Sequence, residues 1–303
     1  MTRPLVLIVN PRSAKGATGR NWPRLRKALR RILPPFDVHI TKHSGDAMEF
    51  AAGAAARYET LVAVGGDGTI NEVANGICQS GAQAALGILP RGTGSDLVRT
   101  LGIPHGFPEA AQLLARGNRR RIDLGKATFL APDGRVQSRW FVNAAEVGFG
   151  AAVSGEVNHP SRFLPGPAAF MWAVLTTLVR HRPTAASVTI DGAASRTLLL
   201  SNAWIANGRY SGGGIKSAPR AVIDDGLLDI VVVQHASLRV RIAGLPRLRS
   251  GRFVKMREVE YRQATQAAFA SDPPELVEVD GDVVGTTPAT FEIEPQRLLV
   301  IAG

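Results

Sequence analysis

Residues 65–69, with the sequence GGDGT, have the residue types and the position of a phosphate-binding loop. They directly follow the apolar run 61–64 and precede a helical stretch that begins near Ile70. Adjacent glycines let a backbone take positive φ and approach a ligand closely, and a helix N-terminus offers unpaired N–H groups to an anion. Thr69 can add a hydroxyl donor, whereas Asp67 needs a cation or hydrogen-bond donors beside it. A tight strand-to-helix turn capped by Asp67 is the structural alternative.

Carboxylates in turn-like segments are the second set of residues that could do chemistry. Asp280 and Asp282 flank a glycine, and a carboxylate presented there could accept a proton from an alcohol. The same three residues suit a hairpin turn, and a turn can still present a carboxylate to a cleft. Isolated aspartates such as Asp96, Asp123 and Asp225 are more often caps or solvated residues.

Composition narrows the class of protein. The 303 residues are 45% hydrophobic, which suits two domains with sizeable cores. The lone Cys78 excludes an internal disulfide and a cysteine-based zinc site, and the six histidines show no metal spacing. We therefore expect a cytoplasmic protein, with neither a signal peptide nor a transmembrane helix.

The net charge of +11 suits nucleic acid, nucleotide phosphates or an anionic membrane equally well. A solvated arginine-rich surface would explain most of these charges too. No recognised nucleic-acid motif is present, so nucleic acid is not an expected partner.

The first part of the chain alternates short apolar runs with helical spacing, which predicts a mostly parallel sheet covered by helices. Ligands of such sheets bind beyond the carboxyl ends of the strands, where the GGDGT loop lies. A helix is expected over residues 45–58 with Asp46 as its N-cap. Strands are expected at 5–9, 36–41, 61–64 and 85–89, and helices also at 22–33 and from 70 onward.

After about residue 121, strand-like runs follow one another with turns between them, which predicts a second, largely antiparallel β-sandwich domain. The domains are expected at 1–121 and 122–303, with the closing run 297–302 able to pair with either. Helices are expected near 167–180 and 236–250. The expected strands are 121–129, 137–147, 186–190, 195–206, 227–234, 258–264, 275–279 and 289–293.

Seven motifs in order resemble those of the diacylglycerol kinase catalytic superfamily, most strongly its soluble bacterial lipid kinases. The GGDGT loop looks like the superfamily signature. The others are the NPRSAKG loop at 10–16, LPRGTGSDLVR at 89–99, IDLG at 122–125, NAAEVGFG at 143–150, the segment 212–229 with GGGI and DDGLLD, and VDGD at 279–282. Together they run over nearly the whole chain.

The resemblance implies an ATP-dependent lipid kinase with its active site in the interdomain cleft. The implied ATP-binding residues are Asn10, Ser13, Thr41, Gly65, Gly66, Asp67, Gly68, Thr69, Asn71 and Thr93. It implies a structural Mg²⁺ bound by Asp225 and by the backbone oxygens of Val222 and Leu227, with Asp96 and Asp123 acting through waters. Asp282 is the implied general base and Asp280 the second choice.

Two residues depart from the family pattern. Ser95 stands where asparagine is usual, which would change a hydrogen bond there. Asp282 stands where glutamate is usual, so its carboxylate reaches one methylene less far. These departures leave a catalytically impaired nucleotide-binding sensor as an alternative.

The substrate implied is diacylglycerol or a similar lipid alcohol, with a sphingoid base, ceramide or phosphatidylglycerol as alternatives. A nicotinamide nucleotide kinase fits the magnesium-loop and late carboxylate motifs less well. The resemblance leaves a homodimer open.

A lipid substrate requires peripheral contact with an anionic membrane surface. The first expected contact interleaves Arg239, Arg241, Arg247, Arg249, Arg252, Lys255 and Arg257 with Leu238, Ile242, Leu245, Leu248 and Phe253. The second is the stretch 162–182. Two amphipathic helices packed on the β domain are the alternative.

Overall fold

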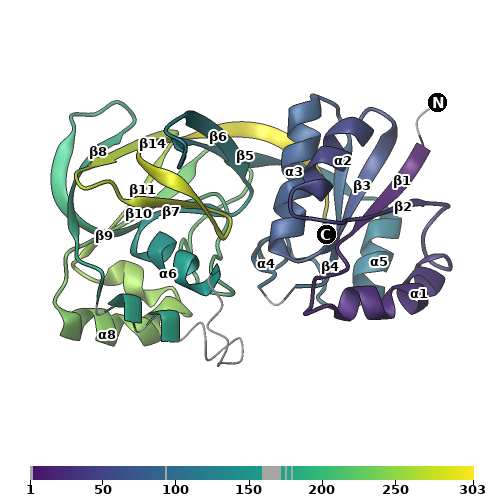
Figure 1. Ribbon diagram of the computed structural model, residues 1–303, viewed down its shortest axis with the longest axis horizontal. Helices are drawn as coiled ribbons and strands as arrows, with labels where there is room; N and C mark the ends of the chain where they lie inside the picture. Colours follow the sequence, from purple (N-terminus) through teal and green to yellow (C-terminus); the bar gives the residue numbers. More distant parts are fainter. Residues whose placement is uncertain (1–2, 93, 159–171, 175, 179) are drawn as a thin grey trace.

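The computed structural model describes residues 3–92, 94–158, 172–174, 176–178 and 180–303 (Figure 1). The described strands belong to one sheet, whose longest hydrogen-bonded path runs β11-β10-β9-β7-β13-β14-β4-β3-β1-β2. Its two ends differ in character, because strands at the N-terminal end are parallel and those at the other end are antiparallel. This is the expected α/β domain followed by a β-sandwich domain.

The N-terminal domain is the parallel part. Its elements are β1 (Arg3–Val9), α1 (Ala17–Leu29), β2 (Asp37–Ile40), α2 (Asp46–Ala54), β3 (Tyr58–Gly65), α3 (Asp67–Ser80), β4 (Ala85–Pro90), α4 (Asp96–Thr100) and α5 (Phe107–Arg116). The strands β1, β3 and β4 are apolar and almost fully buried, as strands covered on both faces must be. Helix α3 packs on β3, and α5 packs on β4. Because β1, β2 and β3 are parallel, the loops that follow them lie at the same edge of the sheet.

The C-terminal domain consists mainly of antiparallel strands. Its elements are β5 (Arg119–Leu130), β6 (Val136–Phe141), β7 (Ala144–Gly148), α6 (Phe149–Asn158), β8 (Thr184–Ile190), β9 (Arg196–Ala206), β10 (Leu228–Gln234), α8 (Leu238–Leu248), the 3-10 helix η1 (Arg252–Lys255), β11 (Val259–Ala264), β12 (Gln266–Ser271), β13 (Leu276–Val279) and β14 (Asp282–Ile301). Buried Phe141, Phe269 and Phe291 centre its core. No described helix is long and apolar enough to cross a membrane.

Strand β14 joins the two domains, and Figure 1 shows it as the long yellow strand that crosses between them. It is antiparallel to β13 and β5, and its end pairs in parallel with β4. Leu298 and Val300 consequently pack in the N-terminal core, whereas Phe291 packs in the C-terminal core. The closing run, which could have paired with either domain, lies between β4 of the first domain and the start of β5, and it pairs with both.

Three local expectations differ from the structure. The single strand expected over 137–147 is two strands, because the N–H groups of Val142 and Asn143 turn to the carboxylate of Asp280. The N-cap of α2 is Gly45, since the carboxylate of Asp46 accepts the Lys42 N–H at 2.6 Å instead. Helices α4, α5 and α6 were not expected, and half of the helix expected near 167–180 lies outside the described residues, whereas residues 172–174, 176–178 and 180 are helical as expected.

Candidate active site

A polar cavity of about 240 Å³ opens where the two domains meet. The N-terminal domain contributes Asn10, Thr41, Gly68 and Thr69, and the first residue of β14, Asp282, faces them. The remaining lining residues are Arg12, Lys42, His43, Ser44, Ala47 and Glu72. The structure therefore brings four of the expected nucleotide-binding residues together with the expected base.

The GGDGT loop is held by close backbone packing rather than by unusual backbone angles. None of its glycines has a positive φ, contrary to the expectation. A Cβ on Gly65 would lie 2.4 Å from the Thr69 Oγ1, and a Cβ on Gly92 would lie 2.6 Å from the Cα of Gly66. Glycine is needed because this loop and the loop after β4 touch through their backbones, and the Arg91 N–H donates to the Gly65 oxygen at 2.7 Å.

Asp67 holds the next loop in place. Its carboxylate accepts the N–H groups of Ser95 at 2.7 Å and Asp96 at 3.0 Å, which caps helix α4. These are the donors that the sequence required for Asp67. Ser95 has φ of +58° and acts through its backbone N–H, so the change from the usual asparagine preserves this contact.

The loops after β1 and β3 are joined by one side chain. Asn10 donates from Nδ2 to Thr69 Oγ1 at 3.0 Å, and its Oδ1 accepts the Arg12 N–H at 2.9 Å. Ser13 lies one turn further along, where its hydroxyl donates to the backbone oxygen of Asn10 and shares a second hydrogen bond with the Thr18 hydroxyl. Ser13 therefore shapes the β1 loop without lining the cavity. The expected contact at Thr93 lies outside the described residues.

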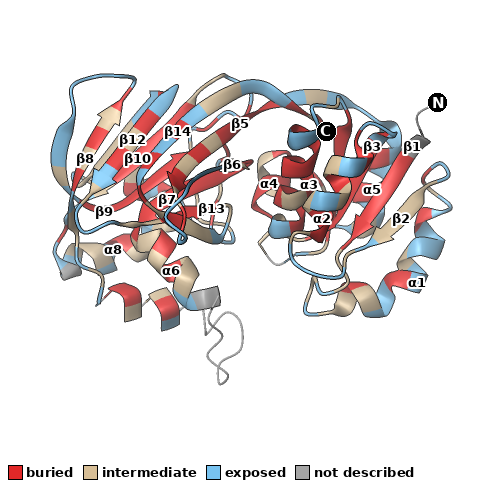
Figure 2. Ribbon diagram, turned by 45° about the horizontal axis from the view of Figure 1, so that its top comes forward, coloured by how far each residue is buried: buried red, intermediate tan, exposed pale blue. Residues whose placement is uncertain are grey.

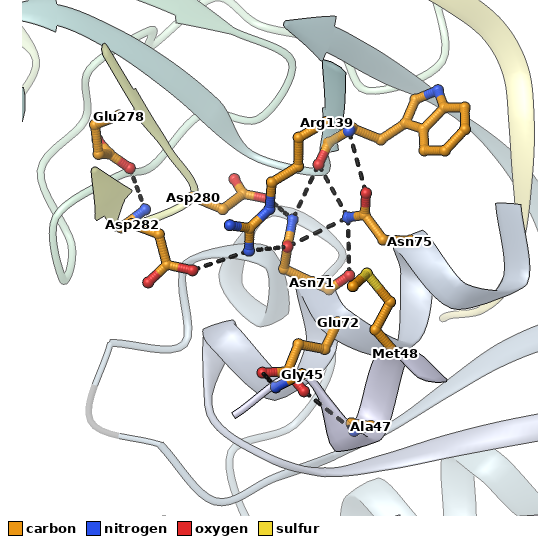
Figure 3. Close-up of polar contacts among 12 residues, drawn as sticks. Gly45, Ala47, Met48, Asn71, Glu72, Asn75, Arg139, Glu278, Asp280 and Asp282 are labelled. Carbon is orange, nitrogen blue, oxygen red and sulfur yellow. Dashed lines mark hydrogen bonds and ion pairs between the residues drawn. The ribbon is translucent and has the colours of Figure 1, made fainter. Parts of the chain in front are cut away.

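Asn71 on α3 connects the two domains (Figure 3). Its Nδ2 donates to Asp280 Oδ2 at 2.7 Å, and its Oδ1 accepts from Arg139 Nη2 at 2.8 Å. The same Nη2 donates to Asp282 Oδ2 at 2.9 Å. Arg139 was not expected as a site residue, because nothing in the local sequence of its strand shows that it reaches α3.

The two candidate bases have different surroundings. Asp280 is half-buried with φ of +46° and accepts the N–H groups of Val142, Asn143 and Ala144 at 2.8–3.1 Å. Burial raises its pKa, and the backbone donors oppose that shift. Asp282 is 57% exposed and lines the cavity. The geometry therefore favours Asp282 as the proton acceptor and gives Asp280 a structural role.

A buried acid pair, also unexpected from the sequence, lies behind this turn. Glu146 on β7 and Glu278 on β13 are cross-strand partners and are 7% and 4% exposed. Burial raises the pKa of Glu146 to about 7, and burial together with the charge of Glu146 raises the pKa of Glu278. Glu278 Oε1 accepts the Gly281 N–H, so this pair supports the turn between Asp280 and Asp282.

The expected magnesium residues are only partly gathered. Asp225 is exposed. Asp123 accepts the N–H group of Gly226, which follows Asp225 in the chain, and that of Gln296, each at 2.7 Å. Asp96 accepts from Arg99 at 2.9 Å and from Gly213 at 2.8 Å. In the part of the chain that the structure describes, no three acidic, histidine or cysteine side chains form a metal cluster.

These contacts show which of the three carboxylates could still bind a metal ion. Backbone N–H groups occupy both Asp123 oxygens, and Asp96 is likewise bonded at both oxygens. Asp225 can still accept further bonds. Its Oδ1 accepts the Leu227 N–H at 3.1 Å, and its Oδ2 is in a long 3.5 Å contact with Gln263. One carboxylate beside backbone oxygens fits Mg²⁺, which retains several of its waters.

Two family models match the chain. Residues 4–127 match the diacylglycerol kinase catalytic domain, and residues 143–302 match the YegS C-terminal NAD kinase beta sandwich-like domain. The chain is 30% identical to a diacylglycerol kinase of Staphylococcus saprophyticus, over 94% of this chain and 90% of that one. It is 32% identical to a protein of Chromohalobacter salexigens named "Probable lipid kinase YegS-like", over 91% and 86%.

Solved structures share the fold. A diacylglycerol kinase from Bacillus anthracis superposes with a TM-score of 0.73 at 23% identity and covers 99% of this chain and 97% of its own. An NAD kinase from Archaeoglobus fulgidus in complex with ATP gives 0.52 at 14% identity, covering 98% and 93%.

Replacing Asp280 with asparagine should destabilise the protein. The asparagine NH2 group would face backbone N–H groups that the carboxylate now satisfies, leaving buried donors unpaired. Asp280→Asn should lower the free energy of unfolding by about 2–4 kcal/mol in urea titrations. The half-exposed Asp282→Asn is the control and should change it by less than about 1 kcal/mol. Equal losses in both variants would contradict the structural role of Asp280.

The buried acid pair should make stability depend on pH. Because the folded-state pKa of Glu146 is about 7 and lies above the ordinary value of 4.5, the folded protein binds more protons in this window. The free energy of unfolding should therefore fall as the pH rises from 4.5 to 7.

Glu146→Gln should flatten that fall, measured as the slope of urea-unfolding free energy against pH. Glu49→Gln removes an exposed carboxylate and is the matched control, which should keep the wild-type slope. A wild-type slope in Glu146→Gln would show that Glu146 does not hold the proton.

Proposed function

We propose a specific reaction for this chain, which belongs to the family of diacylglycerol kinases and YegS-like lipid kinases and is itself a lipid kinase. It phosphorylates the hydroxyl of diacylglycerol or a similar lipid, with ATP as the phosphoryl donor. The product is a lipid of the phosphatidic acid type. The observation that carries the proposal is the polar cavity in which Gly68 and Thr69 face Asp282.

The N-terminal domain supplies the nucleotide side of this cavity. The first N–H groups of α3, at Gly68 and Thr69, have a favourable helix dipole for the phosphates. Arg12 and Lys42 line the same cavity and can neutralise phosphate charge. Asp67 is turned away to α4, so it does not repel the phosphates directly.

Asp282 is the proposed general base. A lipid hydroxyl is a weak nucleophile, and a carboxylate within hydrogen-bond reach accepts its proton as it attacks the γ-phosphorus. Arg139 donates to one Asp282 oxygen at 2.9 Å, which orients the carboxylate. The second oxygen is left for the acceptor. A shorter aspartate is compatible with this role because Arg139 ties it to α3 through Asn71.

Magnesium is proposed at two places. Asp225, with the backbone oxygens of Val222 and Leu227, would hold a structural Mg²⁺, and the Asp123 contact to Gly226 positions that loop. A second Mg²⁺ would arrive with ATP, where it neutralises charge that develops on the phosphates.

The C-terminal domain presents a basic surface for membrane contact. Six of its side chains on and after α8 are exposed: Arg239, Arg247, Arg249, Arg252, Lys255 and Arg257. Ile242 is exposed beside them, whereas Phe253 is buried and Leu248 lines a pocket. The side chain of Leu238 and residues 162–171, 175 and 179 of the second expected contact lie outside the described residues, whereas Trp172 in that stretch is 58% exposed. We propose that the six exposed cations, called here the basic face, bind anionic headgroups.

Asp282→Asn should lower kcat for lipid phosphorylation about 100-fold or more, because general-base catalysis contributes that much. The KM for ATP should change little, since the phosphate-binding loop is intact. The assay measures labelled phosphate transfer to mixed micelles containing, in turn, diacylglycerol, a sphingoid base, ceramide and phosphatidylglycerol. Asp224→Asn, an exposed aspartate, is the matched control.

Wild-type turnover in Asp282→Asn would contradict the assignment of the base. Absence of product with every lipid, together with intact ATP binding, would instead identify a nucleotide-binding sensor.

Charge reversal on the basic face should weaken membrane binding. Each exposed cation near an anionic surface contributes about 1 kcal/mol, so Arg249→Glu with Arg252→Glu should reduce partitioning onto phosphatidylglycerol vesicles about ten-fold or more. Arg24→Glu with Arg26→Glu makes the same charge change on α1 and should bind nearly as well as wild type. Equal losses in co-sedimentation would mean that net charge, and not this face, determines binding.

A further inference from the structure

Asn75 on α3 pairs with β6 much as a neighbouring strand would. Its Oδ1 accepts the Trp140 N–H at 3.1 Å, and its Nδ2 donates to the Trp140 backbone oxygen at 3.0 Å. Among the described strands, β6 pairs with β5 alone, so no described strand covers its other edge. Backbone groups at such an edge need other partners. One side chain of the first domain therefore supplies both partners to a strand of the second domain.

The amide of Asn75 has one orientation that satisfies these contacts. Asn75 is 2% exposed and lies in a part of α3 that is almost entirely buried (Figure 2). Its oxygen must face the Trp140 N–H, because only that atom of the amide can accept. Its Nδ2 then also donates to the side-chain Oδ1 of Asn71 at 3.2 Å. That Oδ1 is the atom that accepts from Arg139, so Asn75 holds two groups on which the place of Arg139 depends.

A second contact holds the same part of β6. The guanidinium of Arg297 on β14 lies over the Trp140 ring, 5.6 Å from its centroid, and donates to the Cys78 backbone oxygen on α3 at 3.1 Å. Trp140 is thus held to α3 through its backbone and its ring. Because Arg139 precedes Trp140 in the strand, the point from which its side chain extends is fixed as well.

Arg139 needs such support because its side chain is long and 26% exposed. A single nitrogen, Nη2, donates both to Asn71 at 2.8 Å and to Asp282 at 2.9 Å (Figure 3). A shift of β6 along α3 would move the guanidinium and the Asp282 carboxylate with it. A displacement of about 1 Å at a reacting group can cost about 100-fold in rate.

We propose that Asn75 is a positioning residue for phosphoryl transfer, which holds the Trp140 backbone against α3 so that Arg139 keeps the Asp282 carboxylate at the polar cavity. Asn75 does not line that cavity, so it acts on the reaction only through the residues that it holds. The inference rests on the proposed function, because it takes Asp282 as the general base.

Steady-state kinetics of phosphate transfer from ATP to lipid micelles test this role. Asn75→Ala should lower kcat about ten-fold or more, because Arg139 no longer keeps the Asp282 carboxylate in one position. The KM for ATP should stay within about two-fold of wild type, since the hydrogen bond from Asn10 to Thr69 remains in place. A higher KM for ATP with unchanged kcat would overturn the proposal.

Asn21→Ala is the matched control. Asn21 is an exposed residue of α1 whose Nδ2 donates to the Ala17 backbone oxygen at 2.8 Å. Asn75 makes the same local contact with the Asn71 backbone oxygen at 3.0 Å. The control therefore loses a contact within its helix but none between domains, and its kcat should stay within about two-fold of wild type. Equal losses of kcat in the two variants would contradict the role given to Asn75.

A double-mutant cycle tests whether Asn75 acts through Arg139. Arg139→Met alone should lower kcat about ten-fold or more, because the Asp282 carboxylate loses the group that orients it. Asn75→Ala added to Arg139→Met should lower kcat by less than about two-fold further, since the group on which Asn75 acts is already missing. Losses that multiply would show that Asn75 does not act through Arg139.

Hydrogen–deuterium exchange reports on the contact without a reaction. Asn75→Ala removes the acceptor of the Trp140 N–H, so that amide should exchange at least about ten-fold faster than in wild type. Unchanged exchange would disprove the contact. Circular dichroism reports whether the variants fold. Should the alanine variant not fold, Asn75→Asp takes its place in the kinetic assay. It keeps the volume and the acceptor, loses the donor to the Trp140 oxygen, and should lower kcat in the same direction.

The results separate this inference from the proposed function. A wild type that phosphorylates none of the lipids would overturn both. An active wild type whose Asn75 variants keep wild-type kcat would overturn the positioning role alone and would leave the lipid kinase reaction as proposed.

Discussion

The carboxylate of Asp280 is the contact on which the arrangement of the site depends. It receives three consecutive backbone N–H groups from the segment between β6 and β7 and a fourth donor from Asn71 of α3. Several backbone donors in a row at one carboxylate leave it little freedom to move. This contact places the β13–β14 turn against the first domain, and Asp282 therefore faces the loop that begins α3. Strand β14 then carries the chain back to pair with β4.

The acidic side chains of the C-terminal domain differ in their burial and in the groups that pair with them, and for that reason they are assigned different roles. Glu146 and Glu278 are buried together, so burial and mutual repulsion keep them from both ionising readily. Asp282 is exposed and paired with Arg139.

The glycine-rich loops show why a correct motif can have an incomplete physical explanation. The sequence indicated that the glycines permit positive φ, yet no glycine of the GGDGT loop has a positive φ. Glycine is needed there because the backbones of Gly66 and Gly92 approach too closely to leave room for a Cβ. Asp67 was expected beside the phosphates and in fact caps α4. Helix α5 carried a readable signal, with Ala110, Ala111 and Leu114 at helical spacing, although it was not expected. The division of the chain at residue 121 stays a proposal, since β14 packs in both cores.

Sequence alone determined the class of fold, the positions of most strands, and the four loop residues and the carboxylate that share the polar cavity. It could do so because apolar periodicity and glycine-rich turns are local properties, and because strands of a parallel sheet end at one edge. Only the tertiary structure decided that Asp282 and not Asp280 faces the cavity, that Arg139 holds it, and that Glu146 and Glu278 are buried side by side. These facts depend on which groups meet across more than a hundred residues of chain, and no local pattern records that.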